Sequence, residues 1–489
     1  MSTNETQAVT AKAVREIFLK CSDFYLRPVW LGGKPDAGVS VCWIDGLVSG
    51  NSVSEDVLRP LTDANRLIRA ENTEQSVERL LRGAVFAGTA QRRTTPGEVA
   101  EDLLHGCCAV IFDRTGSAVT FETKSTDNRS IGEPKIEKTV KGAKDAFVET
   151  LRTNTSLIRR RLRTPDLKLH QTTVGRRSRT DVAVVYLDGV TNPDTLQELF
   201  RRIDAIDVDG AVTAGSLEQY ITDRPGALFP QLLHTERPDT FAAELLAGRA
   251  GIIVDGLPVG FLLPATLSGF LHVAEDRAQA PLAASMLTLL RWCSVFLSLL
   301  LPAFFTALAM YHQEMIPTAL LLSMIEAKQQ VPFSEAAEIL GMLIAFELLM
   351  EAGIRLPDPV GDTVSIIGAL IVGQSAVEAN VLSPISVIVV AVAAISGFTL
   401  PSRDMDTALR LLRFGMVLLA VFLGMFGLML GLALIVWHLC TFESFGVPYT
   451  APMSGGGFWA WVKSLLRLPL PMDKYRPRDL HTPDRRNQG

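Results

Sequence analysis

The chain changes character near residue 282, and this change limits what it can fold into. Before that point charged residues alternate with apolar ones, whereas from 282 to about 442 apolar segments dominate. The segments 292–310 and 382–400 contain no charged residue, and 414–437 is a run of apolar or small residues. An apolar helix of about 20 residues matches the ~30 Å hydrocarbon core of a bilayer. The sequence therefore predicts a soluble part followed by an all-α membrane domain of several spans.

Charge and cysteine content narrow the classes of function. The 489 residues include 47 Lys and Arg and 52 Asp and Glu, so the chain lacks the basic excess of a nucleic-acid-binding protein. Its six cysteines show no metal-ligand spacing, which favours buried free thiols over a disulfide framework. The first thirty residues lack the basic-then-apolar pattern of a signal peptide. We therefore expect the soluble part to stay in the cytoplasm.

The soluble part contains an internal duplication. The segment 39–46 (VSVCWIDG) matches 182–189 (VAVVYLDG), and the segment 96–106 matches 238–248. Alternating apolar positions in the first pair predict half-buried strands. In the second pair, an early proline and a final glycine are typical of helix ends. The sequence therefore predicts an α/β fold of two similar units, each a strand, a helix, an insert, a second helix and a strand hairpin.

The repeated Asp-Gly dipeptides could be proposed as a catalytic or metal site. They are Asp45-Gly46 and Asp188-Gly189, and no histidine or third carboxylate joins them at a fixed spacing. Asp-Gly is also a common turn dipeptide, and we favour the interpretation that these aspartates end strands. We therefore predict no catalytic residue, no metal site and no cofactor, which argues against an enzyme.

The predicted domain boundaries follow from these patterns. The stretch Asn154–Arg163 is basic, and it either contacts anionic lipid or an acidic partner, or forms a solvated linking helix. The expected parts are a first α/β unit over 1–140, a basic helical linker over 141–180, a second α/β unit over 181–281, a membrane domain over 282–442, and a polar, disordered tail over 443–489.

Within the membrane domain we expect four spans, with both chain ends in the cytoplasm. Charged residues inside a membrane are costly and tend to be functional, which singles out Glu347 and Arg291, although Arg291 could also reach the interface. The expected spans lie near 292–310, 361–378, 382–400 and 414–437, with interfacial helices between 312 and 353.

The span 361–378 carries a stripe of small residues. On a helix, one face would hold Gly361, Ser365, Gly368, Ala369, Val372, Ser375 and Ala376. Such a stripe either packs closely against another helix or, repeated around an axis, lines a narrow pore. Gln374 and Glu378 would then lie at the pore mouth, where a carboxylate favours cations.

Several separate segments match a known family in the same order along the chain. They include 154–163, 205–210 (AIDVDG), 312–318 (HQEMIPT), 351–357 (EAGIRLP) and 445–449 (FGVPY). In these segments the chain resembles the A subunits of GerA-type nutrient germinant receptors of endospore-forming bacteria. The similarity runs from about residue 134 to 449 and is weaker in the first unit.

The resemblance implies a non-enzymatic germination protein in the inner spore membrane, with its N-terminal domain in the cytoplasm. It implies partners as well, namely a transporter-like B subunit that senses the nutrient and a lipoprotein C subunit. It further implies a homo-oligomeric ring, a pentamer, around a ligand-gated ion channel, and so favours the pore interpretation of the stripe. The alternatives are a solute carrier, a non-conducting membrane scaffold, and a related branch of A-like subunits that acts in later spore ion release.

Overall fold

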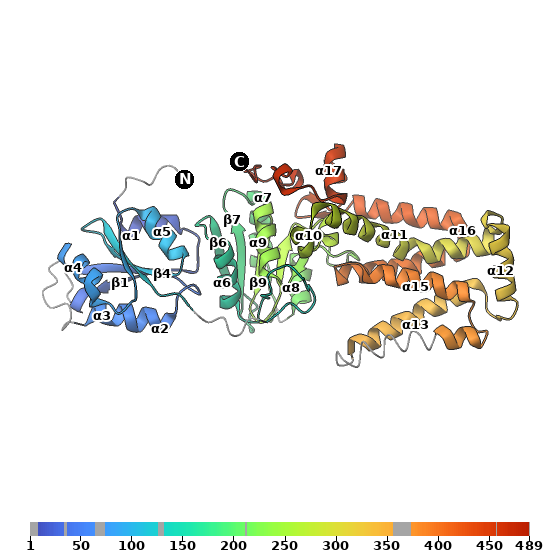
Figure 1. Ribbon diagram of the computed structural model, residues 1–489, viewed down its shortest axis with the longest axis horizontal. Coiled ribbons are helices and arrows are strands. Elements are labelled where there is room, and N and C mark those ends of the chain that lie inside the picture. The colour runs from blue at the N-terminus through green and yellow to red at the C-terminus, as the bar shows by residue number, and fades with distance from the viewer. Residues whose placement is uncertain are drawn as a thin grey trace. The chain divides into compact units, whose positions relative to one another are not determined.

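The computed structural model describes residues 8–33, 37–63, 74–125, 132–210, 213–355, 373–455 and 457–488 (Figure 1). The chain divides into two units, which we describe separately. The sheet unit comprises Met1–Pro225, Leu232–Ala265 and Leu470–Gly489, and the helical unit comprises Gly226–Gln231 and Thr266–Pro469.

The first sheet of the sheet unit has five antiparallel strands in the order β1-β2-β4-β5-β3. Successive residues of β2 point to opposite faces, so Val41 and Cys42 belong to different hydrophobic cores. Helices α1 and α5 cover the Cys42 face, and the helical segments between β2 and β3 cover the other. The strands are β1 (Phe24–Trp30), β2 (Gly38–Ile44), β3 (Ala90–Arg93), β4 (Cys107–Phe112) and β5 (Ser117–Glu122). The helical segments are α1 (Ala11–Ile17), α2 (Gly50–Ser52), η2 (Val53–Leu58), α3 (Arg59–Thr62), α4 (Glu74–Arg79), η3 (Leu80–Ala84) and α5 (Pro96–Leu104).

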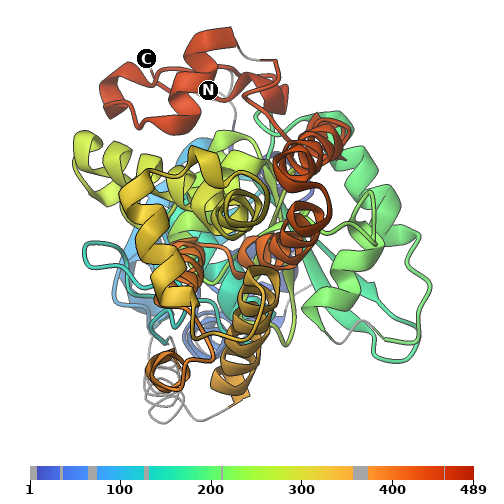
Figure 2. The same ribbon diagram turned by 90° about the vertical axis from the view of Figure 1, so that its right-hand side faces the viewer.

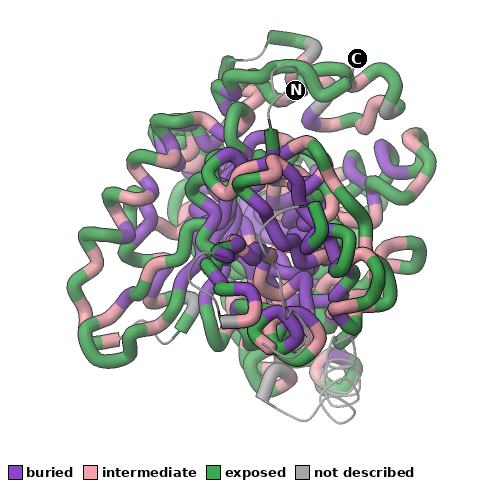
Figure 3. The backbone as a smooth tube through the Cα atoms, turned by 90° about the vertical axis from the view of Figure 1, so that its left-hand side faces the viewer, coloured by how far each residue is buried: buried purple, intermediate pink, exposed green. Residues whose placement is uncertain are grey.

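The second sheet repeats this order as β6-β7-β9-β10-β8, again with antiparallel neighbours. Buried strand residues appear purple in Figure 3. The strands are β6 (Leu167–Val174), β7 (Thr180–Leu187), β8 (Leu233–Thr235), β9 (Ala250–Val254) and β10 (Gly260–Leu263), and the helices are α6 (Leu151–Arg161), α7 (Pro193–Asp204), α8 (Ala214–Ile221) and α9 (Pro238–Ala247).

The matching sequence segments occupy equivalent elements of the two sheets. The first pair lies on β2 and β7, and the second lies on α5 and α9. Gly106 and Gly248 follow these helices with φ of 86° and 109°, the left-handed conformation that favours glycine. Each sheet also has a leading strand and a short edge strand that the sequence analysis did not predict. The edge strands β3 and β8 have only four and three residues, which is too short for a clear periodicity.

The basic stretch around α6 differs from the expected solvated linker. Arg159 on α6 is fully buried and donates two hydrogen bonds to Asp23, with Nε–Oδ2 at 2.7 Å and Nη2–Oδ1 at 3.0 Å. Asp23 directly precedes β1, so this pair joins the two sheets. The predicted linker 141–180 also contains β6, a strand of the second sheet. The arginines of this stretch therefore serve partly in internal contacts.

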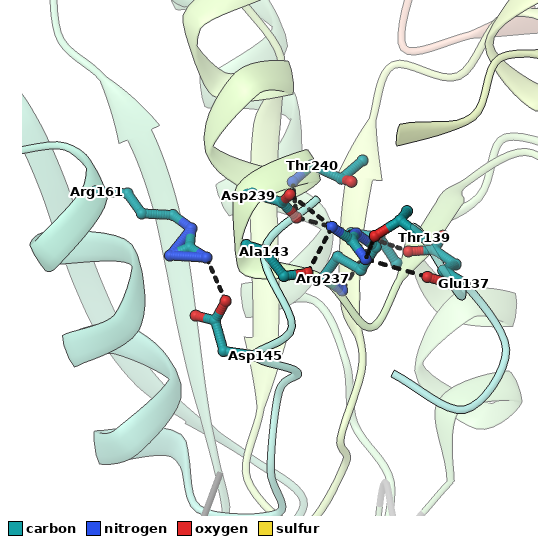
Figure 4. A network of polar contacts seen from close by, with 9 residues as sticks. Glu137, Thr139, Ala143, Asp145, Arg161, Arg237, Asp239 and Thr240 are labelled. Atoms are coloured by element: carbon teal, nitrogen blue, oxygen red, sulfur yellow. Dashed lines mark hydrogen bonds and ion pairs between the residues drawn. The ribbon is translucent and has the colours of Figure 1, made fainter. Parts of the chain in front are cut away.

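Residues 132–150 form an extended strap that is held by one buried arginine (Figure 4). Arg237 is 1% exposed and donates to the carbonyl oxygens of Glu137 and Ala143 and to the hydroxyl of Thr139. Its charge is balanced by Asp239, whose carboxylate accepts two further hydrogen bonds. Because one buried side chain binds three points along the strap, Arg237 fixes the path of the strap.

The helical unit contains two described helices that are long and apolar enough to cross a membrane, α11 (Pro281–Tyr311) and α16 (Arg403–Cys440) (Figure 2). The expected span 382–400 is a shorter helix, α15 (Pro384–Phe398), which Ser383 caps at its N-terminus. The expected span 361–378 lies outside the described residues except for a helical segment at 373–378. The predicted four spans therefore remain a prediction. The other helices are α10 (Ala274–Ala278), α12 (Thr318–Lys328), α13 (Glu335–Arg355) and α17 (Gly457–Leu465).

The segment from Glu443, for which the sequence predicts disorder, contains regular elements. A hairpin of β11 (Glu443–Ser444) and β12 (Val447–Pro448) brings the buried rings of Phe442 and Tyr449 to 5.0 Å. The Tyr449 carbonyl accepts a hydrogen bond from Leu267 N at 2.8 Å. Burial of these aromatic rings offsets the ordering entropy that a polar tail could not overcome.

Candidate functional site in the helical unit

The predicted pore stripe is only partly described. Gly361, Ser365, Gly368, Ala369 and Val372 lie outside the described residues. Of the remaining positions, Ser375 is exposed and Ala376 is partly buried in the helical segment 373–378. The two pore-mouth candidates meet, because Gln374 Nε2 donates to Glu378 Oε1 at 2.8 Å. The pore interpretation itself stays a prediction.

Four charged side chains gather between α13 and α16, and we call them the Arg410 cluster. Glu347 comes from α13, and Asp406, Arg410 and Arg413 come from the first turns of α16. Spacings of four and three residues place the α16 side chains on one helix face. Ser402 begins α16 by accepting a hydrogen bond from Met405 N, which sets the register of this face.

Arg410 connects the two carboxylates of the cluster. Its Nη1 lies 2.7 Å from Glu347 Oε1, and its Nε lies 3.2 Å from Asp406 Oδ2. The Arg410 and Asp406 side chains are 18% and 14% exposed, so water screens this pair only weakly. The cluster therefore ties α13 to the first turns of α16 by charge.

Arg413 lies deeper, where α11, α15 and α16 pack together. Its side chain is buried and donates to the hydroxyl of Ser298 on α11, which is also buried. Gly397 on α15 leaves room for this arrangement, since a Cβ there would lie 2.7 Å from Asp406 Oδ1. Arg413 Nε and Asp406 Oδ1 have no hydrogen-bond partner among the described residues.

A small cavity of about 20 Å³ adjoins these groups. It is lined by apolar side chains, including Leu343 and Phe398, together with the four charged side chains of the cluster. This volume suffices for about one water molecule, and polar groups without partners provide a place to hold one. The cluster is thus a polar site within an otherwise apolar set of helices.

A second group of charges, the Lys328 cluster, joins α12, α13 and the start of α15. Lys328 Nζ lies 2.7 Å from Glu335 Oε1 and 3.3 Å from Glu338 Oε1. Glu338 is fully buried, and its Oε2 accepts a hydrogen bond from Ser383 N at 2.8 Å. Ser386 Oγ donates to Glu335 Oε2 at 3.1 Å. Because Ser383 follows the segment 373–378 closely, this cluster fixes the end of the chain stretch that carries the stripe.

Arg291 lies in a third ionic contact, near the start of α11. Its guanidinium makes two hydrogen bonds to Asp276, with Nη1–Oδ2 at 2.6 Å and Nη2–Oδ1 at 2.9 Å. It also donates to the carbonyl of Leu271. Arg291 is therefore neutralised within the protein, whereas the sequence suggested either a functional charge or one that reaches the interface.

The sequence singled out Glu347 but not its partner, and it missed the Lys328 cluster. The sequence did contain a signal for these pairs, because acidic and basic residues occur in neighbouring apolar segments. Arg410 and Lys328 could have been proposed as the basic partners on this ground. Elsewhere, among the described residues, no group of three or more His, Cys, Asp or Glu side chains is placed to hold a metal ion, and the six cysteines are free thiols.

Comparison with known proteins shows that the chain matches one protein family over most of its length. The family model described as Bacillus/Clostridium GerA spore germination protein matches residues 12–479. The chain is 36% identical over 468 residues to spore germination protein KA of Bacillus subtilis (strain 168), which covers 96% of this chain and 85% of that protein. It is also 36% identical over 438 residues to the uncharacterized membrane protein YfkQ of the same organism, covering 89% and 83% of the two chains.

Among solved structures, the chain is similar to the N-terminal domain of the A subunit of the Bacillus megaterium spore germinant receptor GerK3. The two are 27% identical, with a TM-score of 0.43. The match covers 53% of this chain and 96% of that domain.

Proposed function

Because the chain belongs to the GerA spore germination protein family, we propose that it is the A subunit of a nutrient germinant receptor in the inner spore membrane. Several copies surround an ion-conducting path, and the path opens when a partner subunit binds the nutrient. The B and C subunits implied by the sequence resemblance supply nutrient sensing and a lipoprotein component.

The observation that carries this proposal is the presence of buried charge inside an apolar set of helices. The helices α11 and α16 are long and apolar enough to span a membrane, yet α16 holds Arg413 almost fully buried. Ionisable groups at membrane depth are expensive, and they tend to mark substrate or ion pathways. The Arg410 cluster supplies such groups, with two carboxylates and two arginines.

The proposed path follows the stripe on 361–378, whose small side chains leave room for a hydrated ion. Glu378 and Gln374, which are hydrogen-bonded to each other, then lie at one mouth and favour cations. Opening is a shift between closed and open arrangements of the ring, biased by the partner that binds the nutrient.

Single-channel recording tests this proposal against the carrier and the scaffold. The receptor, purified with its partner subunits, is placed in a planar bilayer and exposed to candidate nutrients, with the untreated complex as control. Stepwise currents that require the nutrient are expected. A slow, saturable flux without steps would indicate a carrier, for which inverted repeats are typical. Silence in a complex that still binds the nutrient would indicate a scaffold.

A further inference from the structure

Helix α17 exposes aromatic side chains that nothing in the proposed channel uses. Its sequence is GFWAWVKSL, and the side chains of Phe458 and Trp461 are 69% and 44% exposed. The two rings lie 6.2 Å apart, and Leu466, just after the helix, is exposed as well. An exposed cluster of large apolar side chains typically marks an interaction surface.

The end of α17 is fixed to the beginning of α11 by hydrogen bonds, as the position of α17 beside the α10–α11 junction in Figure 1 illustrates. Arg467 N donates to Ser285 Oγ at 2.9 Å, and Ser285 Oγ lies 3.2 Å from the Arg467 carbonyl oxygen. The Arg467 guanidinium donates to the Arg277 carbonyl at the end of α10. The aromatic cluster therefore has a defined place beside α11.

The first turns of α11 also expose large apolar side chains. Leu282 and Met286 are 84% and 75% exposed, and they flank Ser285, to which α17 is bound. With 31 residues, α11 is about 46 Å long at 1.5 Å per residue, which exceeds the ~30 Å hydrocarbon core. If the charge-free segment 292–310 fills the core, Ser285 lies about 10 Å outside it, in the head-group layer.

The charges beside this surface match an anionic layer. Between 457 and 469 the chain has two basic residues, Lys463 and Arg467, and no acidic one. Arg277, at the same junction, is exposed. Tryptophan together with lysine and arginine is the composition that protein segments show at a membrane interface, where indole rings lie among head groups and basic side chains contact anionic lipids.

We propose that α17 and the first turns of α11 form an interfacial anchor that binds the head-group layer of an anionic bilayer. Phe458, Trp461, Leu282 and Met286 enter the boundary between head groups and acyl chains, and the net positive charge of the segment 457–469 favours anionic lipids. The anchor rests on the membrane location of the chain but not on ion conduction, so the channel and the anchor can fail independently.

Spin labels placed on the full-length chain in vesicles test the anchor. The exposed thiols Cys293 and Cys440 and the partly buried Cys107 are first replaced by serine. Single labels are then introduced by Trp461→Cys or Leu466→Cys in vesicles of phosphatidylcholine with or without phosphatidylglycerol. Power saturation with oxygen and with a water-soluble nickel complex reports the depth of each label.

Two labelled positions serve as matched references. Leu19→Cys lies on an exposed site of the sheet unit, and Phe422→Cys lies on the exposed face of α16. We expect the labels at 461 and 466 to have depths between these references. In addition, Lys463→Glu should shift the label at 461 toward water in vesicles that contain phosphatidylglycerol but not in pure phosphatidylcholine, because only the former attracts the lysine.

Two outcomes would overturn the anchor. Nickel accessibility at 461 equal to that at 19 would place α17 in water. Protection of the label from both reagents would show that protein, such as a second copy of the chain, covers the surface in place of lipid.

Discussion

At the scale of single residues, the buried contact between Arg159 and Asp23 is one of several contacts that connect the two sheets. The side chains are 1% and 5% exposed, and both guanidinium–carboxylate bonds are 3.0 Å or less. Arg159 lies on α6, which precedes the second sheet, and Asp23 directly precedes the first strand of the first sheet. Removing one partner of a buried pair leaves an uncompensated charge, which costs about 3–5 kcal/mol.

Asp23→Asn or Arg159→Met is therefore expected to lower the free energy of unfolding of the sheet unit by about 3–5 kcal/mol. Urea denaturation of the full chain, followed by tryptophan fluorescence, measures this loss. The matched control is Arg59→Ala, which removes an exposed pair with Glu55 and should cost no more than about 0.5 kcal/mol. Equal effects of the two changes would show that the buried pair is not what holds the sheets together.

Glu137 in the strap makes the sheet unit sensitive to pH. Burial, helped by the nearby negative charge of Glu236, raises the pKa of its carboxyl from 4.5 to about 7, although a hydrogen bond from Thr235 and the charge of Arg237 act to lower it. The folded protein then binds the proton more tightly than the unfolded chain does. The contribution of Glu137 to the free energy of unfolding is therefore greatest below pH 4.5, and it is lost as the pH rises to about 7.

Glu137→Gln should remove this dependence. A pKa difference of that size corresponds to about 3 kcal/mol in the free energy of unfolding. In the wild type, the amide hydrogens of the strap should therefore exchange measurably faster at pH 7.5 than at pH 5, after correction for intrinsic rates. Hydrogen exchange of residues 132–150 by mass spectrometry provides the measurement. Glu133→Gln, on the exposed part of the same strap, is the control and should retain the pH dependence of the wild type.

At the scale of elements, we expect bulky substitutions on the two faces of the helix predicted over 361–378 to have different effects on ion release. On the small-residue face, Ser365→Phe or Gly368→Phe should block nutrient-triggered ion release because the ring fills the passage. On the other face, Ile367→Phe is the matched control and should leave release unchanged. Potassium efflux from proteoliposomes that contain the complete receptor measures both.

Assembly must be checked in the same preparations. Co-purification of the partner subunits should be unaffected by either set of variants. Normal efflux from an assembled Gly368→Phe receptor would show that the stripe packs against a protein neighbour instead of lining the path.

We expect the Lys328 cluster to hold α12 and α13 against the end of the stripe segment. Lys328→Met leaves the fully buried Glu338 without its nearby positive charge, which should destabilise the contact by about 3–5 kcal/mol. Hydrogen exchange should then increase at residues 383–390, because Glu338 no longer holds Ser383 firmly. Glu326→Gln, on an exposed position of α12, is the control. Unchanged exchange in the Lys328→Met protein would contradict this role.

At the scale of the whole molecule, the proposed path requires more than one copy of the chain. One helix with a small-residue stripe cannot enclose an ion, whereas several copies around an axis can. Native mass spectrometry of the receptor extracted in detergent should therefore show several copies of this chain per complex, and the sequence resemblance implies five. A complex with a single copy would rule out a ring.

Local patterns decided much of the architecture. The alternation in 39–46 and 182–189 predicted two strands that lie at equivalent places in two sheets of the same order. The apolar runs 292–310 and 414–437 predicted two long helices, although α11 begins earlier, at Pro281. These features can be predicted from the sequence because the periods of strands and helices, and the length of an apolar run, are local patterns that involve only neighbouring residues.

What the sequence determined by itself is therefore the repeated strand and helix of each α/β unit, the long apolar helices, and the family to which the chain belongs. Only the tertiary structure decided which charges meet: Arg159 with Asp23 over 136 residues, and Arg410 with Glu347 over 63 residues. The sequence shows that Arg410 and Glu347 lie in apolar surroundings, but not that they are partners. Pairing across such distances depends on how whole helices and sheets pack, and no local period encodes that packing.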